Sequence, residues 1–258
     1  MALSAQKTRY GFYYFPDSLH YRENDLRSWI PELTELGASW LTLLAPTDRS
    51  IPEVFIRNIL EAGIQPILHL PLSMVNSQRP EELSVIFNAY ARWGVKYITL
   101  FDRPNLLKNW SPSDWAKNNL VERFLDIFST LAEHARQVGL IPVFPPLEPG
   151  GDYWDTAFLF SALQGLQRRG LTELLDQLVL SAYAWPGNRS PNWGVGGPER
   201  WPNTRPYFTP QDSEDHLGFR IFDWYLAIAN AAIGKPCPII LLAAGSRIGD
   251  QQDSRSPA

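Results

Sequence analysis

The sequence predicts an α/β protein in which parallel strands, buried on both faces, alternate with helices. Short apolar runs recur along the chain, amphipathic stretches separate them, and glycine stands at many of the helix-to-strand junctions. Strands of a parallel sheet that is covered on both faces are near-continuous apolar runs, whereas half-exposed strands alternate with polar residues. The regular succession of such runs and helices favours the α/β class.

Glycine follows five of the predicted helices, at Gly37, Gly63, Gly94, Gly139 and Gly234. The position just past a helix end often takes a left-handed backbone, which glycine adopts at little steric cost. A strand is predicted after each of them, at residues 40–45, 65–70, 96–101, 141–144 and 238–242. Two further strands, at 10–15 and 178–183, are predicted from their apolar runs alone.

The helices between the strands have one apolar face with a period of 3.6 residues. One such face consists of Leu26, Trp29, Ile30, Leu33 and Leu36. Another consists of Leu120, Phe124, Ile127, Leu131 and Ala135. Ser50 and Glu53, with Pro52 between them, predict a capping box at the start of a further helix.

These elements predict a (β/α)8 TIM-barrel-like fold, with about seven strand–helix units visible and the eighth missing. The 258 residues suit a single barrel domain over 1–258, with a long aromatic loop at 184–218 and a polar tail at 249–258. Either the chain is a truncated form of a longer protein, or the barrel is incomplete. An incomplete barrel would leave two edge strands open to a partner chain or to homo-oligomer formation. A doubly wound sheet is the alternative, although no glycine-rich loop follows the first strand at 15–18.

Composition narrows the function. The net charge is −4 with no basic run, which disfavours nucleic acid as a partner. The single Cys237 excludes an internal disulfide and a cysteine metal cluster. We expect no metal and no cofactor, because no nucleotide-binding or metal-ligand motif is present. No signal peptide is visible and no apolar run could span a membrane, so we expect a cytoplasmic protein or one exported with its signal removed.

Candidate site residues stand where the predicted strands end, since working residues of α/β barrels lie at the carboxyl ends of strands. They are Asp17, Asp48, His69, Asp102 with Arg103 and Asn105, Glu148, Asp152, Tyr183, Trp185, and Arg247. Several carboxylates therefore meet aromatic side chains on one rim. Glycoside hydrolysis needs such a pair, with one carboxyl group as proton donor and one carboxylate as nucleophile or base.

Within this set, Glu148 is the predicted acid and Asp102 the predicted nucleophile or base. Glu148 lies among prolines, where apolar surroundings would raise the pKa of its carboxyl group. Asp102 is also compatible with a salt-bridged turn. Asp17, Asp48 and Asp155 are more typical of caps and turns, and His69 of a core or rim histidine.

Sugar contacts are expected from aromatic side chains near the same loops. Trp154, Trp185 and Trp193 are the predicted platforms for sugar rings, with Asp17, His69, Asp152 and Tyr183 as further substrate-binding residues. The alternative is that the aromatic rings fill gaps under long loops.

Two segments resemble the clan of (β/α)8 retaining glycoside hydrolases that includes cellulases and β-glycosidases. Residues 98–105 read ITLFDRPN, where that clan usually has Asn-Glu-Pro, and residues 240–245 read ILLAAG, where it has a second glutamate. Arg103 and Ala243 stand at the two glutamate positions.

The resemblance implies a glycoside hydrolase acting on a β-linked glucan or related polysaccharide, with other carboxylates in the catalytic roles. The two substitutions equally imply a non-catalytic carbohydrate-binding barrel. A third reading is a barrel fragment that docks a partner domain or chain.

Overall fold

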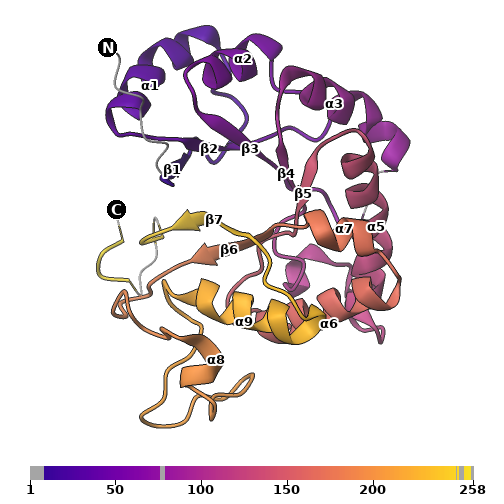
Figure 1. Ribbon diagram of the computed structural model, residues 1–258, viewed down its shortest axis with the longest axis vertical. Helices are drawn as coiled ribbons and strands as arrows, with labels where there is room; N and C mark the ends of the chain where they lie inside the picture. The colour runs from indigo at the N-terminus through magenta and orange to yellow at the C-terminus, as the bar shows by residue number, and fades with distance from the viewer. Residues whose placement is uncertain (1–8, 76–78, 248, 250–252, 257–258) are drawn as a thin grey trace.

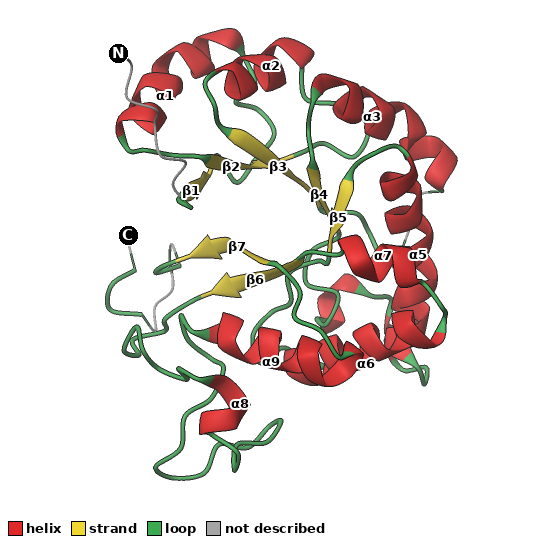
Figure 2. Cartoon of the chain, in the orientation of Figure 1, coloured by secondary structure: helices red, strands yellow, loops and turns green. Residues whose placement is uncertain are grey.

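The computed structural model describes residues 9–75, 79–247, 249 and 253–256, which leaves part of the predicted tail at 249–258 outside the described residues. Its parallel strands surround a common interior and its long helices lie outside them (Figures 1 and 2). The strands are β1 (Gly11–Tyr13), β2 (Trp40–Leu44), β3 (Gln65–Leu70), β4 (Tyr97–Leu100), β5 (Ile141–Val143), β6 (Leu180–Ala184) and β7 (Ile239–Ala244). The predicted α/β, TIM-barrel-like class is therefore confirmed.

The helices follow the strands in alternation, with extra short helices in three of the connections. The main ones are α1 (Glu23–Glu35), α2 (Glu53–Glu61), α3 (Pro80–Trp93), α5 (Leu120–Gln137), α6 (Asp155–Arg168) and α9 (Ile221–Ile233). The short ones are α4 (Pro112–Trp115), α7 (Thr172–Gln177) and α8 (Gly197–Arg200), with a 3₁₀ turn, η1, at Leu107–Asn109. Within the described residues, no helix is long and apolar enough to cross a membrane.

The strands follow one another in space in the same order as in the chain. β1 to β5 form one parallel sheet, and β6 pairs with β7. Between them, Val143 bridges to Val179 and the Phe144 amide donates to the Val179 carbonyl at 2.7 Å. This order differs from that of a doubly wound sheet, whose first strand lies inside the sheet.

The gap in the wall lies between β1 and β7, which pair with each other nowhere in the described part of the chain. β1 is short, and Phe12 is 41% exposed. Gly11 is needed for the pairing of β1 with β2, because a Cβ atom there would lie 2.6 Å from Trp40 Cβ. The predicted strand at 10–15 is correspondingly reduced to three residues.

Strand side chains alternate between two cores, as the pleat requires. Leu41 and Leu43 of β2 point outward and pack in the large core between strands and helices. Ile67, Tyr183 and Leu242 point inward and fill the middle of the barrel.

Of the helix ends predicted from the sequence, the glycine caps are confirmed and the capping box is not. All five glycines predicted to end helices have a left-handed backbone, with φ between 70° and 94°. The capping box predicted at Ser50 is wrong. Glu53 pairs with Arg57 at 2.7 Å, and the Ile51 amide donates to the Tyr90 hydroxyl at 2.8 Å. The helix begins at Glu53 with Pro52 as its N-cap, and the Glu53 carboxylate pairs with Arg57 one turn later in the same helix.

The long loop at 184–218 packs on itself through its aromatic residues. Trp193 donates to Asp215 at 2.8 Å, and Trp224 of α9 donates to the Gly194 carbonyl at 2.8 Å. A buried hydrogen-bonded cluster of Asp155, His216 and Tyr225, called the clasp below, fixes the end of the loop. Asp155 of α6 contacts His216 Nε2 at 2.7 Å and accepts from Tyr225 at 2.8 Å. Asp155, expected to cap a helix, thus ties the loop to α6 and α9.

This clasp predicts a large stability effect. Removing one member of a buried hydrogen-bonded pair leaves the other buried without a partner. Asp155→Ala should therefore lower the free energy of unfolding by about 3–5 kcal/mol. Asp176→Ala, which removes an exposed partner of Lys235, should cost less than about 1 kcal/mol. Urea unfolding of both variants measures the difference, and equal losses would contradict the clasp.

Candidate functional site

The loop after β4 adopts an unusual backbone at the carboxyl end of the barrel. Phe101 and Arg103 have positive φ values of 68° and 45°, a region that costs non-glycine residues about 1–3 kcal/mol each. The Asn109 side chain holds the loop by donating to the Asp102 carbonyl at 3.0 Å and to the Arg103 carbonyl at 2.8 Å. The Arg103 amide donates to the Pro146 carbonyl at 2.9 Å, which joins this loop to the next.

Arg103 lies between the two carboxylates that the sequence singles out. Its guanidinium contacts Asp102 at 2.7 Å and Glu148 at 3.3 Å. Burial alone lowers the pKa of Arg103, but the Asp102 and Glu148 charges outweigh it and raise that pKa above its ordinary value. The guanidinium therefore stays charged and keeps both carboxylates on one rim.

Glu148 has a second cationic partner and a rigid backbone. Arg247, beyond β7, contacts its carboxylate at 3.1 Å. Asn105, fully buried, accepts from the Glu148 amide at 2.9 Å and donates to the Glu148 carbonyl at 2.8 Å. The apolar surroundings expected for Glu148 are therefore not what the structure contains. The proline-rich segment instead carries Glu148 to the guanidinium groups of Arg103 and Arg247.

The aromatic part of the site is a pair from β6. Tyr183 donates to Asp102 at 2.8 Å, and Trp185 stacks on its ring with centroids 5.3 Å apart. Arg103 lies over the Tyr183 ring at 5.6 Å and Arg247 over the Trp185 ring at 5.7 Å. Burial, then the Asp102 charge, raises the pKa of Tyr183 far above its ordinary value, so its hydroxyl remains a donor.

His69 of β3 lies in the barrel interior next to the site, and its imidazole is neutral. Its Nε2 lies 3.1 Å from the Phe101 carbonyl, which can only accept, so Nε2 carries the proton. Its Nδ1 then accepts from the Tyr13 hydroxyl at 3.1 Å. Burial lowers the pKa of His69, whose exposed fraction is 2%. His69 thus supports the strained turn at Phe101, the predicted rim or core role.

The side chains described so far form one connected network at the carboxyl ends of the strands: Tyr13, His69, Asp102, Arg103, Glu148, Tyr183, Trp185 and Arg247. Other predicted residues lie outside this network. Asp17 accepts from the Leu19 amide at 2.8 Å in an exposed turn, and Asp48 pairs with Arg49 on the surface. Asp152 accepts from the Leu107 amide at 2.8 Å and joins two loops. The turn interpretation of Asp17 and Asp48 describes the structure, whereas a substrate contact by Asp17 or Asp152 stays a prediction.

Two of the three predicted sugar platforms pack within loops. Trp193 donates to Asp215 and has Arg189 over its ring at 5.0 Å. Trp154 packs against Tyr207 with centroids 4.7 Å apart. Both rings pack against residues of the long loop, and a sugar contact by either ring stays a prediction.

Tyr13 was not predicted as a site residue, whereas Arg103 and Arg247 were predicted at the rim without an assigned role. Tyr13 and Arg247 stand at or just beyond strand ends, which is a usable signal. The bridging role of Arg103 had no signal, because its reach to Glu148 depends on the positive φ at Arg103.

No protein-family model matches this chain, and no curated protein sequence matches it. Solved structures with a similar fold include D-allulose 3-epimerase from Methylomonas sp., at 12% identity over 95% of this chain and 86% of that one, with a TM-score of 0.48. A GH128 endo-β-1,3-glucanase from Amycolatopsis mediterranei has 16% identity over 88% and 70%, with a TM-score of 0.44.

A family 51 α-L-arabinofuranosidase from Bifidobacterium longum has 14% identity over 66% of this chain, with a TM-score of 0.42. The chain spans 41% of that arabinofuranosidase and 39% of a family 44 xyloglucanase from Paenibacillus polymyxa. Glycoside hydrolases and a sugar epimerase thus occur together among these structures. The likeness is one of fold, and it assigns no activity to this chain.

The neutral state of His69 predicts a pH effect on stability. Because its pKa is lowered in the folded protein, the unfolded chain binds a proton there first, and stability is lost as pH falls below about 6.5. His69 contributes at most about 1.4 kcal/mol per pH unit. Urea unfolding at pH 7.5 and 5.5 should show a smaller pH dependence for His69→Gln than for the unaltered protein. An unchanged dependence would contradict the neutral assignment.

Proposed function

We propose that the rim around Arg103 binds carbohydrate, with a β-linked gluco-oligosaccharide as the expected ligand. One observation carries this: Asp102, Arg103, Glu148 and Arg247 form a continuous charged network beside the stacked Tyr183 and Trp185 rings. A sugar hydroxyl can donate a hydrogen bond to a carboxylate and accept one from a guanidinium group. The network therefore offers partners for a hydroxyl both as donor and as acceptor. The carbon face of a sugar ring needs an apolar neighbour, which the aromatic pair supplies.

The contacts around Trp185 define how a sugar would approach. Arg247 lies over its ring and Tyr183 stacks against it, so a sugar meets the edge of the pair and not an open face. The Trp185 indole nitrogen is buried and has no hydrogen-bond partner among the described residues. A ligand oxygen beside it would satisfy this donor.

Binding without turnover is favoured by the partners of the titratable groups that the structure describes on the rim. Both carboxylates face guanidinium groups, Tyr183 holds its proton tightly, and the neutral His69 donates a hydrogen bond from its Nε2–H to the Phe101 carbonyl. A glycoside hydrolase needs one carboxyl group that is protonated at working pH. The Arg103 and Ala243 positions, where the resembling clan has its glutamates, are consistent with a binding role.

Calorimetric titration with β-1,4- and β-1,3-linked gluco-oligosaccharides tests the proposal. Glu148→Gln and Trp185→Ala should each weaken binding about 10- to 100-fold, the size of a lost charge-assisted hydrogen bond or of a lost edge contact with its indole hydrogen bond. Glu133→Gln is the matched control, since Glu133 pairs with Arg136 on the outer helix α5. No binding by the unaltered protein, or equal binding by all variants, would contradict a sugar site here.

Glycoside hydrolysis is the second candidate, and the convergence of Asp102 and Glu148 on one guanidinium favours it. In this scheme Glu148 protonates the leaving oxygen, and Asp102 is the nucleophile or the base that activates water. Arg103 would have to withdraw from Glu148 when the substrate binds, because the guanidinium occupies the space between the carboxylates.

Release of reducing ends from the same oligosaccharides separates the two candidates. If the hydrolase scheme holds, Asp102→Asn and Glu148→Gln should each lower the rate at least about 100-fold, as loss of acid–base catalysis does. Hydrolysis that persists in both variants would contradict these roles. Binding without any hydrolysis would leave the binding barrel as the function.

A further inference from the structure

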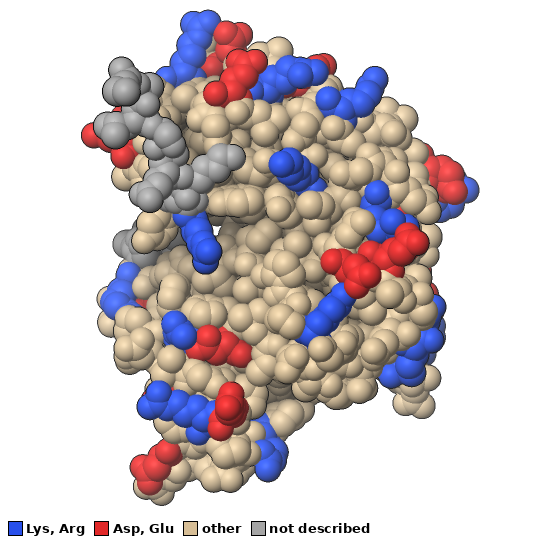
Figure 3. Space-filling model, in the orientation of Figure 1, with Lys and Arg blue, Asp and Glu red and all other residues tan. Residues whose placement is uncertain are grey.

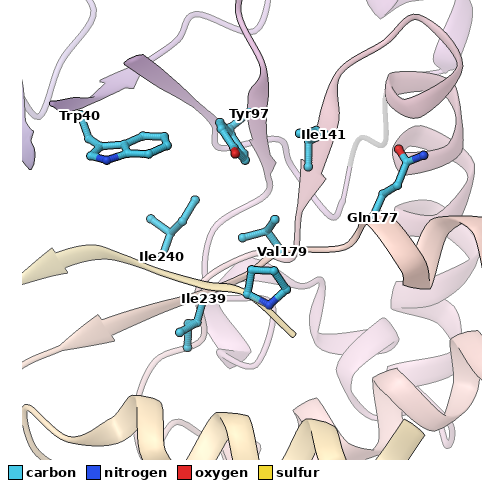
Figure 4. Close-up of a pocket in the computed structure, with 8 residues that line it drawn as sticks. Trp40, Tyr97, Ile141, Gln177, Val179, Ile239 and Ile240 are labelled. Atoms are coloured by element: carbon cyan, nitrogen blue, oxygen red, sulfur yellow. The ribbon is translucent and has the colours of Figure 1, made fainter. Parts of the chain in front are cut away.

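A hollow lies at the amino-terminal end of the strands, opposite the rim around Arg103. It is walled by the first residues of several strands and by the segments leading into β6 and β7, and its volume is about 370 Å³. Its lining consists of Trp40, Tyr97, Ile141, Gln177, Val179, Pro238, Ile239 and Ile240. In the close-up, Trp40, Tyr97 and Ile141 face Val179 and Ile240 across a common space (Figure 4).

The hollow presents apolar surface to water. Trp40 and Tyr97 meet edge to face, with centroids 5.5 Å apart and an angle of 64° between the rings. Trp40, Tyr97, Ile141 and Ile240 are each only partly buried. Monomeric proteins rarely leave large apolar side chains together in a concavity unless something binds there.

This hollow is separate from the rim around Arg103. Ile67, Tyr183 and Leu242 are buried between the two ends and pack as one cluster, with Trp40, Tyr97 and Ile240 against it. A ligand in the hollow would therefore not contact the carboxylates. Their hydrogen bonds and ion pairs play no part in its recognition.

One glutamine, Gln177, lines the hollow, and a second, Gln65, lies in the strand wall next to it. Gln177, at the end of α7, lines the hollow and is exposed. Gln65 opens β3 as the register partner of Trp40, and its side chain shares the inward face of Ile67. Its amide nitrogen is buried and has no hydrogen-bond partner among the described residues. Because Gln65 does not line the hollow, the hydrogen-bond donor that a ligand there can reach is the side-chain amide of Gln177.

We infer that this hollow binds a flat aromatic small molecule that carries a hydrogen-bond acceptor. Its volume lies in the range of small-molecule sites, about 300–1,000 Å³. The rings of Trp40 and Tyr97 offer stacking and edge contacts, and the isoleucines offer aliphatic cover. All the lining side chains are uncharged, which disfavours phosphates and carboxylates. A sugar would leave most of its hydroxyls without partners there.

Titration with coumarin, a flat bicyclic molecule with acceptor oxygens, tests the inference by ligand-observed NMR. We expect saturable binding in the millimolar range or tighter. Ile240→Trp, which fills the hollow, should weaken it at least about tenfold. Val85→Trp is the matched control, because it adds the same side chain to α3 at a position that is 78% exposed. The control should bind coumarin as the unaltered protein does.

The experiment has clear contrary outcomes. Coumarin binding that is absent, or that is unchanged in a folded Ile240→Trp variant, would overturn the inference. Ile141→Phe, a smaller filling change at the opposite wall, replaces Ile240→Trp if that variant does not fold. Sedimentation in the same buffer addresses a second copy of the chain as the occupant. A concentration-dependent dimer that coumarin dissociates would assign the hollow to that copy instead.

Discussion

The ion pairs of Arg103 with Asp102 and Glu148 join the loops that follow β4 and β5, and the rest of the carboxyl-terminal rim depends on them. Asp102 in turn accepts from Tyr183 of β6, and Glu148 contacts Arg247 beyond β7. Four consecutive strands are therefore connected through one guanidinium group and its partners. Such a network is costly to break, because each loss leaves a partly buried charge without its partner.

The two ends of the barrel offer different chemistry. The rim is charged and hydrogen-bonded, suited to a ligand rich in hydroxyl groups, and the hollow at the other end is aromatic and aliphatic. Tyr183 lies between them, with its ring in the apolar interior and its hydroxyl on Asp102. The charged side chains on the face in Figure 3 are of both signs and scattered, so no single-sign patch on that face competes with either site.

The wall of strands is not closed between β1 and β7 in the described part of the chain. β1 and β7 lack a pairing partner on the side where they face each other in the described structure. β1 lies so close to β2 that a Cβ atom at Gly11 would clash with Trp40. The hollow lined by Trp40 and Ile240 opens at the amino-terminal ends of the same wall. The long loop, which the Asp155 and His216 clasp secures, covers the outside near α9.

Sequence alone determined the α/β class, the seven strands and the glycines that end helices. Those features depend on residues close together in the chain, whose periodicity and left-handed backbone preference are local properties. It also identified Asp102 and Glu148 as rim residues, because parallel strands bring their carboxyl ends to one edge. The partners of those residues were decided only in three dimensions. Arg103 reaches Glu148 across two loops, and Asp155 meets His216 from 61 residues away. No local pattern encodes such distant pairings, and they set the charge state and chemistry of the site.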